Sequence, residues 1–357
     1  METYGGAERV TQEMARAFPD APVVAILGRP EVARRMGLDG RFRSLLRPRR
    51  TLLRRYRLLA PLFPAFVDRV RLEEADVVLS SSYAFAHRLR ARNEAVRVCY
   101  CHSPLRFAWS MTEGYRGEWA PRPLGGRAFE LLAKGMRRSD RRSSRGVDRY
   151  LTQSPFTADQ IERFYGRRAE VIGAPVDTEL FTPGRRPPGD YFLLCGRLVE
   201  PYKRASVAIG AFRELPHRLV VAGDGPALEQ LRADAPDNVE FVGHLEDAAL
   251  VEAMRGCTAA IFPSRDDFGL IPLEVMACGR PVIAYADGGA RHTVAAGVTG
   301  EFFEDQTPGA LADAVRAFEP GGYDTGAIRA HALRWSAERF RERIRAAVVS
   351  AASHEAV

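Results

Sequence analysis

Short apolar runs alternate with helix-length amphipathic segments along most of this chain. The runs consist of Val, Ile and Leu with little polar alternation, which is typical of parallel strands buried on both faces of a sheet. The pattern predicts strands at residues 21–27, 75–82, 96–103, 149–154, 169–176, 191–198, 217–225, 239–245, 259–264 and 280–289. We therefore expect an α/β fold of two doubly wound domains that face each other across a cleft, with ligands beyond the carboxyl ends of the strands.

A stretch rich in Pro, Gly and Arg at residues 184–190 predicts a hinge between the two domains. We expect an N-terminal domain over residues 1–183 and a C-terminal domain over residues 184–334. The remaining residues, 335–357, have apolar positions at helical spacing. They predict a C-terminal helix that packs back toward the N-terminal domain.

The N-terminal domain lacks room for its expected first strand. Gly5 and Gly6 open an amphipathic helix, but only Met1-Glu2-Thr3-Tyr4 comes before them. In a doubly wound domain such a turn follows the first strand, and a strand of about five residues does not fit. Either the natural start lies upstream of Met1, which we favour, or the domain carries an uncovered groove between neighbouring strands.

Composition narrows the class of protein. The chain has 357 residues and 46% hydrophobic residues, which suits two globular domains, and it contains no apolar run long enough to span a membrane. The first residues do not have the pattern of a secretory signal, so we expect a cytoplasmic location, either free or peripheral on the inner face of the plasma membrane. Five scattered cysteines do not form a disulfide framework. Cys99, Cys101 and His102 have no second cluster to complete a zinc site, and no metal is expected.

The positive charge is unevenly distributed. The formal net charge is +7, and Lys134 and Lys203 are the two lysines of the chain. The segment Arg41–Arg57 contains eight arginines and no acid, interleaved with Leu, Phe and Tyr. Such a segment suits an anionic lipid surface or a phosphorylated acceptor, and the alternative is a solvated helix face. Nucleic acid is not the expected partner because no recognition motif accompanies the segment.

Two constellations follow buried strands in the C-terminal half. Arg197 and Lys203 flank the turn after the strand at 191–198, where a guanidinium and an ammonium can neutralise a diphosphate without a metal. Asp266 and Glu274 flank a segment that contains Phe268, Gly269 and Leu270. Free N–H groups at a helix start suit a phosphate, and carboxylates suit sugar hydroxyls. The alternatives are an exposed basic pair and acidic helix capping.

Two glycine pairs are weaker candidates. Gly5 and Gly6 at a helix start, and Gly223 and Gly225 after the strand at 217–225, let the backbone approach a phosphate or a sugar. A tight turn explains each pair equally well.

Taken together, these segments resemble glycosyltransferase family 4, and within it the mannosyltransferase-like branch of bacterial polysaccharide biosynthesis. The resemblance covers almost the whole chain. It rests on GGAERV (5–10), YCHSPLRFAW (100–109), TQSPFTADQI (152–161), GAPVD (173–177), GRLVEPYKR (196–204), GDGP (223–226) and DDFGLIPLEVMACGRPVIAYADGGA (266–290).

The resemblance implies a GT-B fold, in which two Rossmann-like domains bind a nucleoside-diphosphate sugar. Arg197 and Lys203 match the basic pair that holds the donor diphosphate, and Glu274 matches the acid that binds the ribose. Asp266 stands where the family usually has the glutamate that contacts the donor sugar, and it is one methylene shorter. His102 matches a histidine near the donor sugar, with a core histidine as the alternative. Gly6 matches the loop glycine near the phosphates.

The implied reaction transfers a hexose, expected to be mannose from GDP-mannose, to a glycan or polyprenyl-linked acceptor with retention of configuration. No D-x-D sequence occurs, so no divalent metal is expected. UDP-sugars are the competing donors. A nucleotide-binding dehydrogenase is the first alternative class, but GDGPAL lacks the third glycine of the dinucleotide motif. A non-catalytic sugar-nucleotide-binding scaffold is the second.

The basic segment generates a test of membrane contact. We expect the protein to sediment with anionic vesicles at low salt and to be released as salt screens the charges. Replacing Arg49, Arg50, Arg54 and Arg55 with Gln should abolish sedimentation. Unchanged sedimentation of that variant would contradict lipid docking through Arg41–Arg57.

Overall fold

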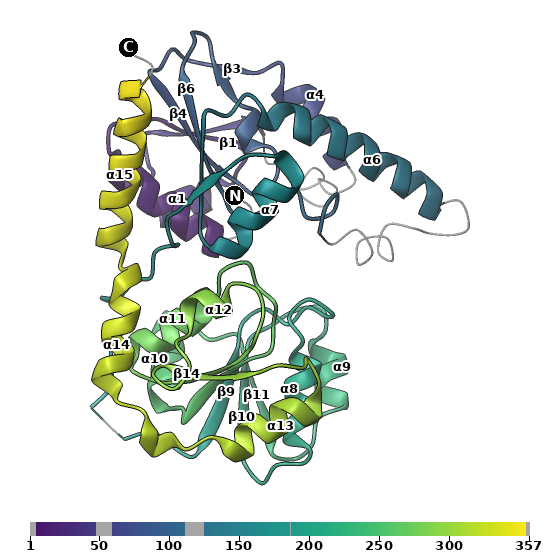
Figure 1. Ribbon diagram of the computed structural model, residues 1–357, viewed down its shortest axis with the longest axis vertical. Coiled ribbons are helices and arrows are strands. Elements are labelled where there is room, and N and C mark those ends of the chain that lie inside the picture. Colours follow the sequence, from purple (N-terminus) through teal and green to yellow (C-terminus); the bar gives the residue numbers. More distant parts are fainter. Residues whose placement is uncertain (1–4, 48–58, 111–124, 186, 355–357) are drawn as a thin grey trace. The chain divides into compact units, whose positions relative to one another are not determined.

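The computed structural model describes residues 5–47, 59–110, 125–185 and 187–354 (Figure 1). It divides into two compact units. The first combines Met1–Pro175 with Glu338–Val357, and the second is Val176–Ala337. All strand pairings in the sheets of the described residues are parallel, as the apolar pattern predicts.

The strands of the first unit form separate parallel sheets. β1 (Val23–Leu27) pairs with β2 (Phe42–Leu46), and the two-residue strands β3 (Arg71–Leu72) and β5 (Arg90–Ala91) pair with each other. A four-stranded sheet contains, in spatial order, β4 (Val77–Ser82), β6 (Val96–Cys101), β7 (Arg149–Thr152) and β8 (Ala169–Val171). No strand among the described residues joins β1 to β4.

This break leaves apolar strands half-exposed. All five residues of β1 and the first five of β4 are only partly buried, whereas five of the six residues of β6 are buried. The strand expected to lead into the first helix is not among the described residues. Within the part of the chain that the structure describes, β1 and β4 each have one edge without a strand partner, and such edges are the weak point of an apolar sheet.

The helix α7 (Pro155–Tyr165) of the first unit is capped at both ends. α7 begins after Ser154, whose hydroxyl accepts from the Thr157 N–H, and ends at Gly166 in the left-handed region. α15 contacts α1 through an ion pair between Arg341 and Glu13, 2.5 Å long. The helices are α1 (Gly6–Ala17), α2 (Pro30–Arg35), α4 (Phe63–Val67), α6 (Gly125–Ser144), α7 (Pro155–Tyr165) and α15 (Ala337–His354), with 3-10 turns η1 (Ala60–Leu62) and η2 (Ala86–Arg88).

Part of the basic segment folds differently from the helix-face alternative. Residues 42–46 form β2, and the Arg41 guanidinium donates to backbone carbonyls that include those of Ala15 and Phe18. The arginines of the proposed lipid-docking test, which all lie within 48–58, fall outside the described residues.

The second unit is a single six-stranded sheet with helices on both faces. Its spatial order is β11 (Val239–Gly243), β10 (Arg218–Ala222), β9 (Tyr191–Cys195), β12 (Ala259–Phe262), β13 (Val282–Tyr285) and β14 (Gly300–Phe303). The helices are α8 (Ala205–Phe212), α9 (Leu228–Ala233), α10 (Asp247–Gly256), α11 (Leu270–Ala277), α12 (Ala290–Thr293), α13 (Pro308–Ala317) and α14 (Thr325–Ala332), with 3-10 turns η3 (Pro320–Gly322) and η4 (Leu333–Trp335).

The strand order of the second unit indicates where a ligand would bind. The chain runs from β9 outward through β10 to β11, then returns to the other side of β9 and runs outward from β12 to β14. The direction of winding therefore changes between β9 and β12. In open parallel sheets, the carboxyl ends of the strands at such a change border the binding crevice.

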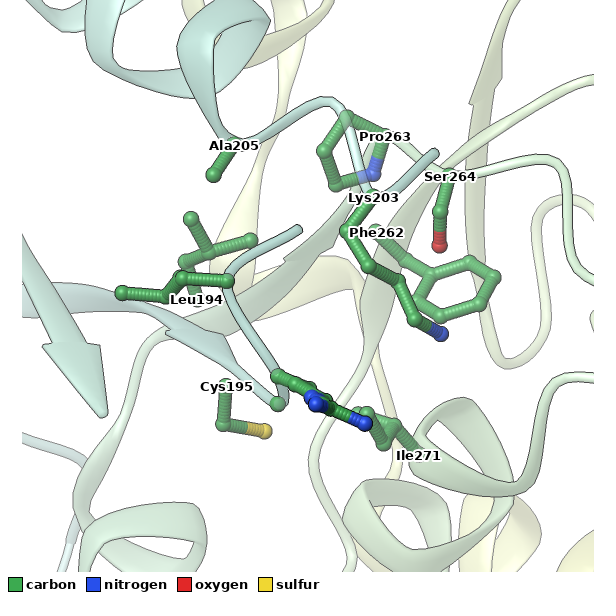
Figure 2. A pocket seen from close by; sticks show the side chains of 11 residues that line it. Leu194, Cys195, Lys203, Ala205, Phe262, Pro263, Ser264 and Ile271 are labelled. Carbon is green, nitrogen blue, oxygen red and sulfur yellow. The ribbon is translucent and has the colours of Figure 1, made fainter. Parts of the chain in front are cut away.

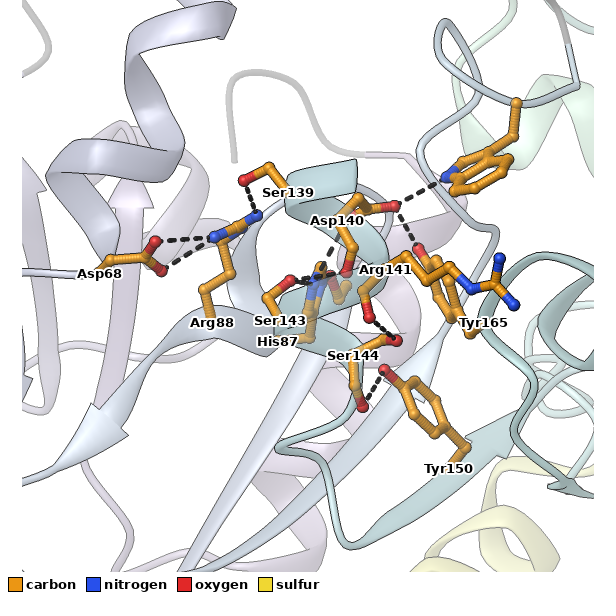
Figure 3. Close-up of polar contacts among 12 residues, drawn as sticks. Asp68, His87, Arg88, Ser139, Asp140, Arg141, Ser143, Ser144, Tyr150 and Tyr165 are labelled. Carbon is orange, nitrogen blue, oxygen red and sulfur yellow. Dashed lines mark hydrogen bonds and ion pairs between the residues drawn. The ribbon is translucent and has the colours of Figure 1, made fainter. Parts of the chain in front are cut away.

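A buried polar network ties α6 to α7 and η2 in the first unit (Figure 3). The Asp140 carboxylate, 1% exposed, accepts hydrogen bonds from Trp109 Nε1 at 2.9 Å and from the Tyr165 hydroxyl at 2.7 Å. His87 Nε2 lies 2.8 Å from the Ser143 hydroxyl and 3.5 Å from Asp140. Because Asp140, His87, Ser143 and Tyr165 are buried, the network fixes how these elements pack.

Burial shifts the pKa values of Asp140 and His87 in this network. It raises the pKa of Asp140 to about 6, although hydrogen bonds from Trp109 and Tyr165 oppose the shift. It lowers the pKa of His87 to about 3, aided by the positive charges of Arg88 and Arg97. Near neutral pH the network therefore holds a neutral imidazole beside a buried carboxylate that is mostly ionised.

Asp140 should make folding stability depend on pH. Its folded pKa lies above its unfolded value, so its stabilising contribution is complete near pH 4 and is lost as pH rises through 6. Relative to an Asp140→Asn variant, the wild type should lose on the order of 2 kcal/mol of unfolding free energy over that interval. Urea unfolding at several pH values measures the difference. The exposed Asp313→Asn variant is the control, and parallel curves for wild type and Asp140→Asn would refute the assignment.

Candidate functional site

Lys203 and Asp266 meet at the change of winding in the second unit. Lys203 lies just before α8, in the loop after β9, and Asp266 lies in the loop after β12. Their side chains form an ion pair with 2.5 Å between Nζ and Oδ2, and they are 23% and 15% exposed. Asp266 Oδ1 is buried and makes no hydrogen bond to the described residues. The site therefore presents a partly shielded cation and an unused acceptor oxygen.

A pocket surrounds the Lys203 side chain. Figure 2 shows Lys203, Ser264 and Ile271 on its walls, with Cys195 at the end of β9. Arg197 also lines the pocket and is exposed. Its other lining residues are Leu194, Gly196, Leu198, Ala205, Phe262 and Pro263. The pocket is thus lined mainly by small or apolar residues, and its two basic side chains, Arg197 and Lys203, both come from the loop after β9.

The pocket also contains a thiol. Burial raises the pKa of Cys195 well above its usual range, and the negative charge of Glu274 adds to the shift. The thiol is therefore neutral near pH 7 and is not an activated nucleophile. The same effect indicates that the Glu274 carboxylate lies close to the end of β9. Glu274 is buried and is the fifth residue of α11, so it lies in the second turn of the helix.

The loop that carries Asp266 has a tightly defined backbone. Gly269 precedes α11 with φ of 90°, in the left-handed region, and Leu270 is the first helical residue. The Gly289 N–H donates to the Asp266 carbonyl at 2.7 Å, and a Cβ on Gly289 would lie 2.2 Å from the Phe268 backbone. Phe268 is 3% exposed, so its ring belongs to the interior and only its backbone can contribute to the site.

Gly223 and Gly225 are needed for packing between two strand-end loops. A Cβ on Gly223 would lie 1.9 Å from the Gly196 carbonyl oxygen, and one on Gly225 would lie 2.1 Å from that of Leu198. Leu198 donates its N–H to the Asp224 carbonyl at 2.9 Å. These glycines thereby hold the loop that carries Arg197. α9 begins at Leu228, so Pro226 lies in the loop before the helix.

The remaining candidates belong to the first unit. Gly5 is the N-cap of α1 in an extended conformation, and Gly6 is the first helical residue, as expected. His102 follows β6 directly and is 6% exposed. Its Nε2 atom lies 2.8 Å from the Ser81 hydroxyl, and its carbonyl accepts from Gln153 Nε2 at 2.9 Å. Burial lowers the pKa of His102 to about 4, so the imidazole is neutral at physiological pH.

Some site residues were missed by sequence analysis. Ser264 follows β12 and could have been found by the same strand-end argument that singled out Asp266. Cys195 and Ile271 carry no such signal. Within the described part of the chain, no group of three or more His, Cys, Asp or Glu side chains could hold a metal ion, and no helix is long and apolar enough to span a membrane.

Solved structures share this architecture. The model superimposes on the Anabaena protein HepE, crystallised with UDP and glucose, with a TM-score of 0.70, 17% identity, and coverage of 98% of this chain and 97% of HepE. The apo form of the lipopolysaccharide outer core galactosyltransferase WaaB superimposes with a TM-score of 0.63 and 17% identity. The match covers 98% of this chain and 97% of WaaB. At this identity the likeness defines the fold, which is GT-B, with two Rossmann-like domains.

Family models extend the agreement from fold to family. Residues 4–180 match the model described as Glycosyltransferase Family 4, and residues 176–328 match the model described as Glycosyl transferases group 1. The chain belongs to glycosyltransferase family 4.

Curated relatives match over a shorter range. A D-inositol 3-phosphate glycosyltransferase 1 of Catenulispora acidiphila is 32% identical over 224 residues, 54% of this chain and 53% of that protein. A D-inositol 3-phosphate glycosyltransferase of Acidothermus cellulolyticus is 34% identical over 227 residues, 53% of this chain and 50% of that protein. The chain thus spans about half the length of the curated relatives it matches.

The close approach at Gly225 generates a stability prediction. Gly225→Ala forces a Cβ against the Leu198 backbone and should lower the unfolding free energy by about 1–3 kcal/mol. Gly309 in α13 has open space around a built Cβ, so Gly309→Ala is the control and should be neutral or stabilising by up to about 1 kcal/mol. Chemical unfolding of both variants measures this. Equal effects would refute the packing role of Gly225.

Proposed function

We propose that this protein is a glycosyltransferase that moves a hexose from a nucleoside-diphosphate sugar to a glycan or lipid-linked acceptor in cell-envelope polysaccharide assembly. The observation that carries the proposal is the meeting of Lys203 and Asp266 at the change of winding, with Arg197 on the same pocket. Membership of glycosyltransferase family 4 supports the same activity. HepE, a structural neighbour, is described with UDP-glucose in a further crystal structure.

The basic side chains suit a diphosphate. Lys203 is partly buried and Arg197 is exposed on the same loop, so both can reach an anion that enters the pocket. A diphosphate would compete with Asp266 for Lys203. As Lys203 turns to the phosphate, Asp266 becomes free to accept hydrogen bonds from sugar hydroxyls, a task for which its buried Oδ1 already has no other partner.

The same groups can stabilise the departure of the nucleotide. When the bond between sugar and phosphate breaks, negative charge grows on the leaving phosphate and the sugar becomes oxocarbenium-like. Lys203, Arg197 and the N–H groups at the start of α11 would stabilise that charge from fixed positions. We propose retention of configuration by front-face attack, in which the leaving phosphate accepts the acceptor's proton. No metal is required by this scheme.

Two classes of donor, GDP-sugars and UDP-sugars, fit this proposal. The sequence resemblance favours GDP-mannose, whereas the neighbouring HepE structures contain UDP or UDP-glucose. A thermal-shift panel of GDP-sugars and UDP-sugars distinguishes them, because a ligand stabilises the folded protein according to its affinity. We also propose that the protein contacts an anionic membrane surface. Such contact would bring it to a lipid-linked acceptor.

Substitution of Lys203 tests the catalytic role. Lys203→Ala should lower kcat by about a hundredfold or more, because it removes charge stabilisation that is largest in the transition state. Glu274→Gln should mainly weaken nucleotide binding. The measurements are donor hydrolysis and transfer rates over a range of donor concentrations.

Lys134→Ala is the matched control, because Lys134 is the other lysine of the chain and is exposed on α6. It should leave kcat and KM unchanged. If Lys203→Ala raises KM and leaves kcat unchanged, Lys203 does not stabilise the leaving group. Nucleotide-sugar binding without turnover in the wild type would favour the scaffold alternative.

A further inference from the structure

The helix α14 contacts the last residues of two helices that begin at the candidate site (Figure 1). The first is α11, which begins after the loop of Asp266 and carries Glu274. The second is α12, which begins after Gly289, whose N–H donates to the Asp266 carbonyl. Both helices start beside the loop of Asp266, so the placement of their backbones sets where the groups of the site lie.

The Arg329 guanidinium of α14 binds the last residue of α11. Its Nη1 atom donates to the Ala277 carbonyl at 2.6 Å and to the Phe181 carbonyl at 2.9 Å, and its Nη2 atom donates to the Thr178 carbonyl at 3.0 Å. The last carbonyls of a helix have no partner within the helix, and a cation beside them also suits the helix dipole. Arg329 therefore caps α11 about one turn after Glu274.

A second side chain of α14 binds the last residue of α12. His331 Nε2 lies 2.9 Å from the Thr293 carbonyl, and the ring must donate because a carbonyl oxygen has no proton. The ring packs against Trp335 at 5.0 Å between ring centroids, which limits its rotation. Thr293 in turn donates its hydroxyl to the Gly289 carbonyl at 3.3 Å. His331 therefore holds α12 at the end opposite to Gly289.

The same helix is connected to the places where the chain passes between the two units. The chain enters the second unit at Val176 and leaves it at Ala337. The Val176 N–H donates to the Trp335 carbonyl at 2.8 Å, and the Ala337 N–H donates to the Val176 carbonyl at 3.2 Å. Arg329 reaches the carbonyls of residues in the crossing segment, which we define as residues 176–181. One side chain thus connects the entering chain to the end of α11.

We propose that Arg329 and His331 are positioning residues for the donor site, which hold α11 and α12 against the crossing segment. This inference deepens the proposed function and rests on it for its effect on donor binding. Arg329 acts through Glu274, because a displaced α11 moves the carboxylate that is expected to bind the nucleotide. Since α11 and the crossing segment share one guanidinium, a donor that restrains α11 also restrains the crossing segment.

Amide hydrogen exchange of the free protein, followed by mass spectrometry, tests the clamp without any assay of activity. In Arg329→Gln, exchange should become about tenfold faster in peptides from α11 and from the crossing segment, because hydrogen bonds from a charged group are lost. Peptides from α13 should keep their rates. Arg316→Gln is the matched control, because Arg316 is an exposed arginine of α13 that pairs with Asp313 at the surface. It should leave α11 and the crossing segment unchanged. An unchanged rate in α11, or an equal increase in all peptides, would overturn the proposal.

The His331 contact supplies a second pair of variants, which serves where Arg329→Gln does not fold. His331→Phe keeps a ring against Trp335 but removes the donor, so exchange in α12 should become faster. His331→Gln keeps an N–H donor at a similar distance from the backbone and should restore most of the wild-type protection. Equal exchange of α12 in His331→Phe and in the wild type would contradict the positioning role of His331.

Calorimetric titration of UDP and GDP separates this inference from the proposed function. Arg329→Gln should weaken binding of the preferred diphosphate about tenfold, and Glu274→Gln should weaken it as well. In the double variant, Arg329→Gln should cause little further loss because it acts through Glu274, whereas a general loss of stability gives additive effects. Additive losses would contradict this inference alone. A wild type that binds neither nucleotide would contradict the proposed function alone, because exchange in the free protein still decides whether Arg329 holds α11.

Discussion

The ion pair between Lys203 and Asp266 is the interaction on which the candidate site depends. It joins the loops that follow β9 and β12, the two strands between which the sheet reverses its winding. Both side chains are mostly buried, so each would carry an uncompensated charge in a poorly solvated place without the other. In the proposed function, an incoming diphosphate would take the Lys203 ammonium and release the Asp266 carboxylate. The ion pair would therefore be exchanged for the contacts with the donor.

Glycines in the neighbouring loops allow the close backbone packing that holds the loops of this ion pair in place. Gly223 and Gly225 let one strand-end loop lie against the backbone that carries Arg197, and Gly289 lets another lie against the loop of Asp266. Sequence analysis treated Gly223 and Gly225 as candidate ligand contacts or a tight turn. The structure gives them a packing role, which is compatible with a nearby phosphate. Backbone rigidity here matters because preorganised charge stabilises a transition state better than mobile charge.

The fold could be predicted largely from the sequence, since uninterrupted runs such as those of β9 and β12 are buried on both faces and carry no polar alternation. β2 was missed because this short run lies within the arginine-rich segment, whose composition also suits a helix at a membrane surface. Strand-end logic found Lys203 and Asp266, but it could not show that they pair, because their contact depends on strand order. The link from Thr11 to Ser81 and His102 joins residues far apart in the chain through ordinary hydroxyls, which give no sequence signal.

The central claim is that the Lys203 pocket binds the diphosphate of a nucleotide. Calorimetric titration of UDP, UMP, GDP and GMP tests it most directly, because each pair differs by one phosphate. At least one diphosphate should bind about tenfold or more tightly than its monophosphate, and Lys203→Ala should largely abolish that difference. Equal affinities of the diphosphates and monophosphates for the wild-type protein would contradict the account.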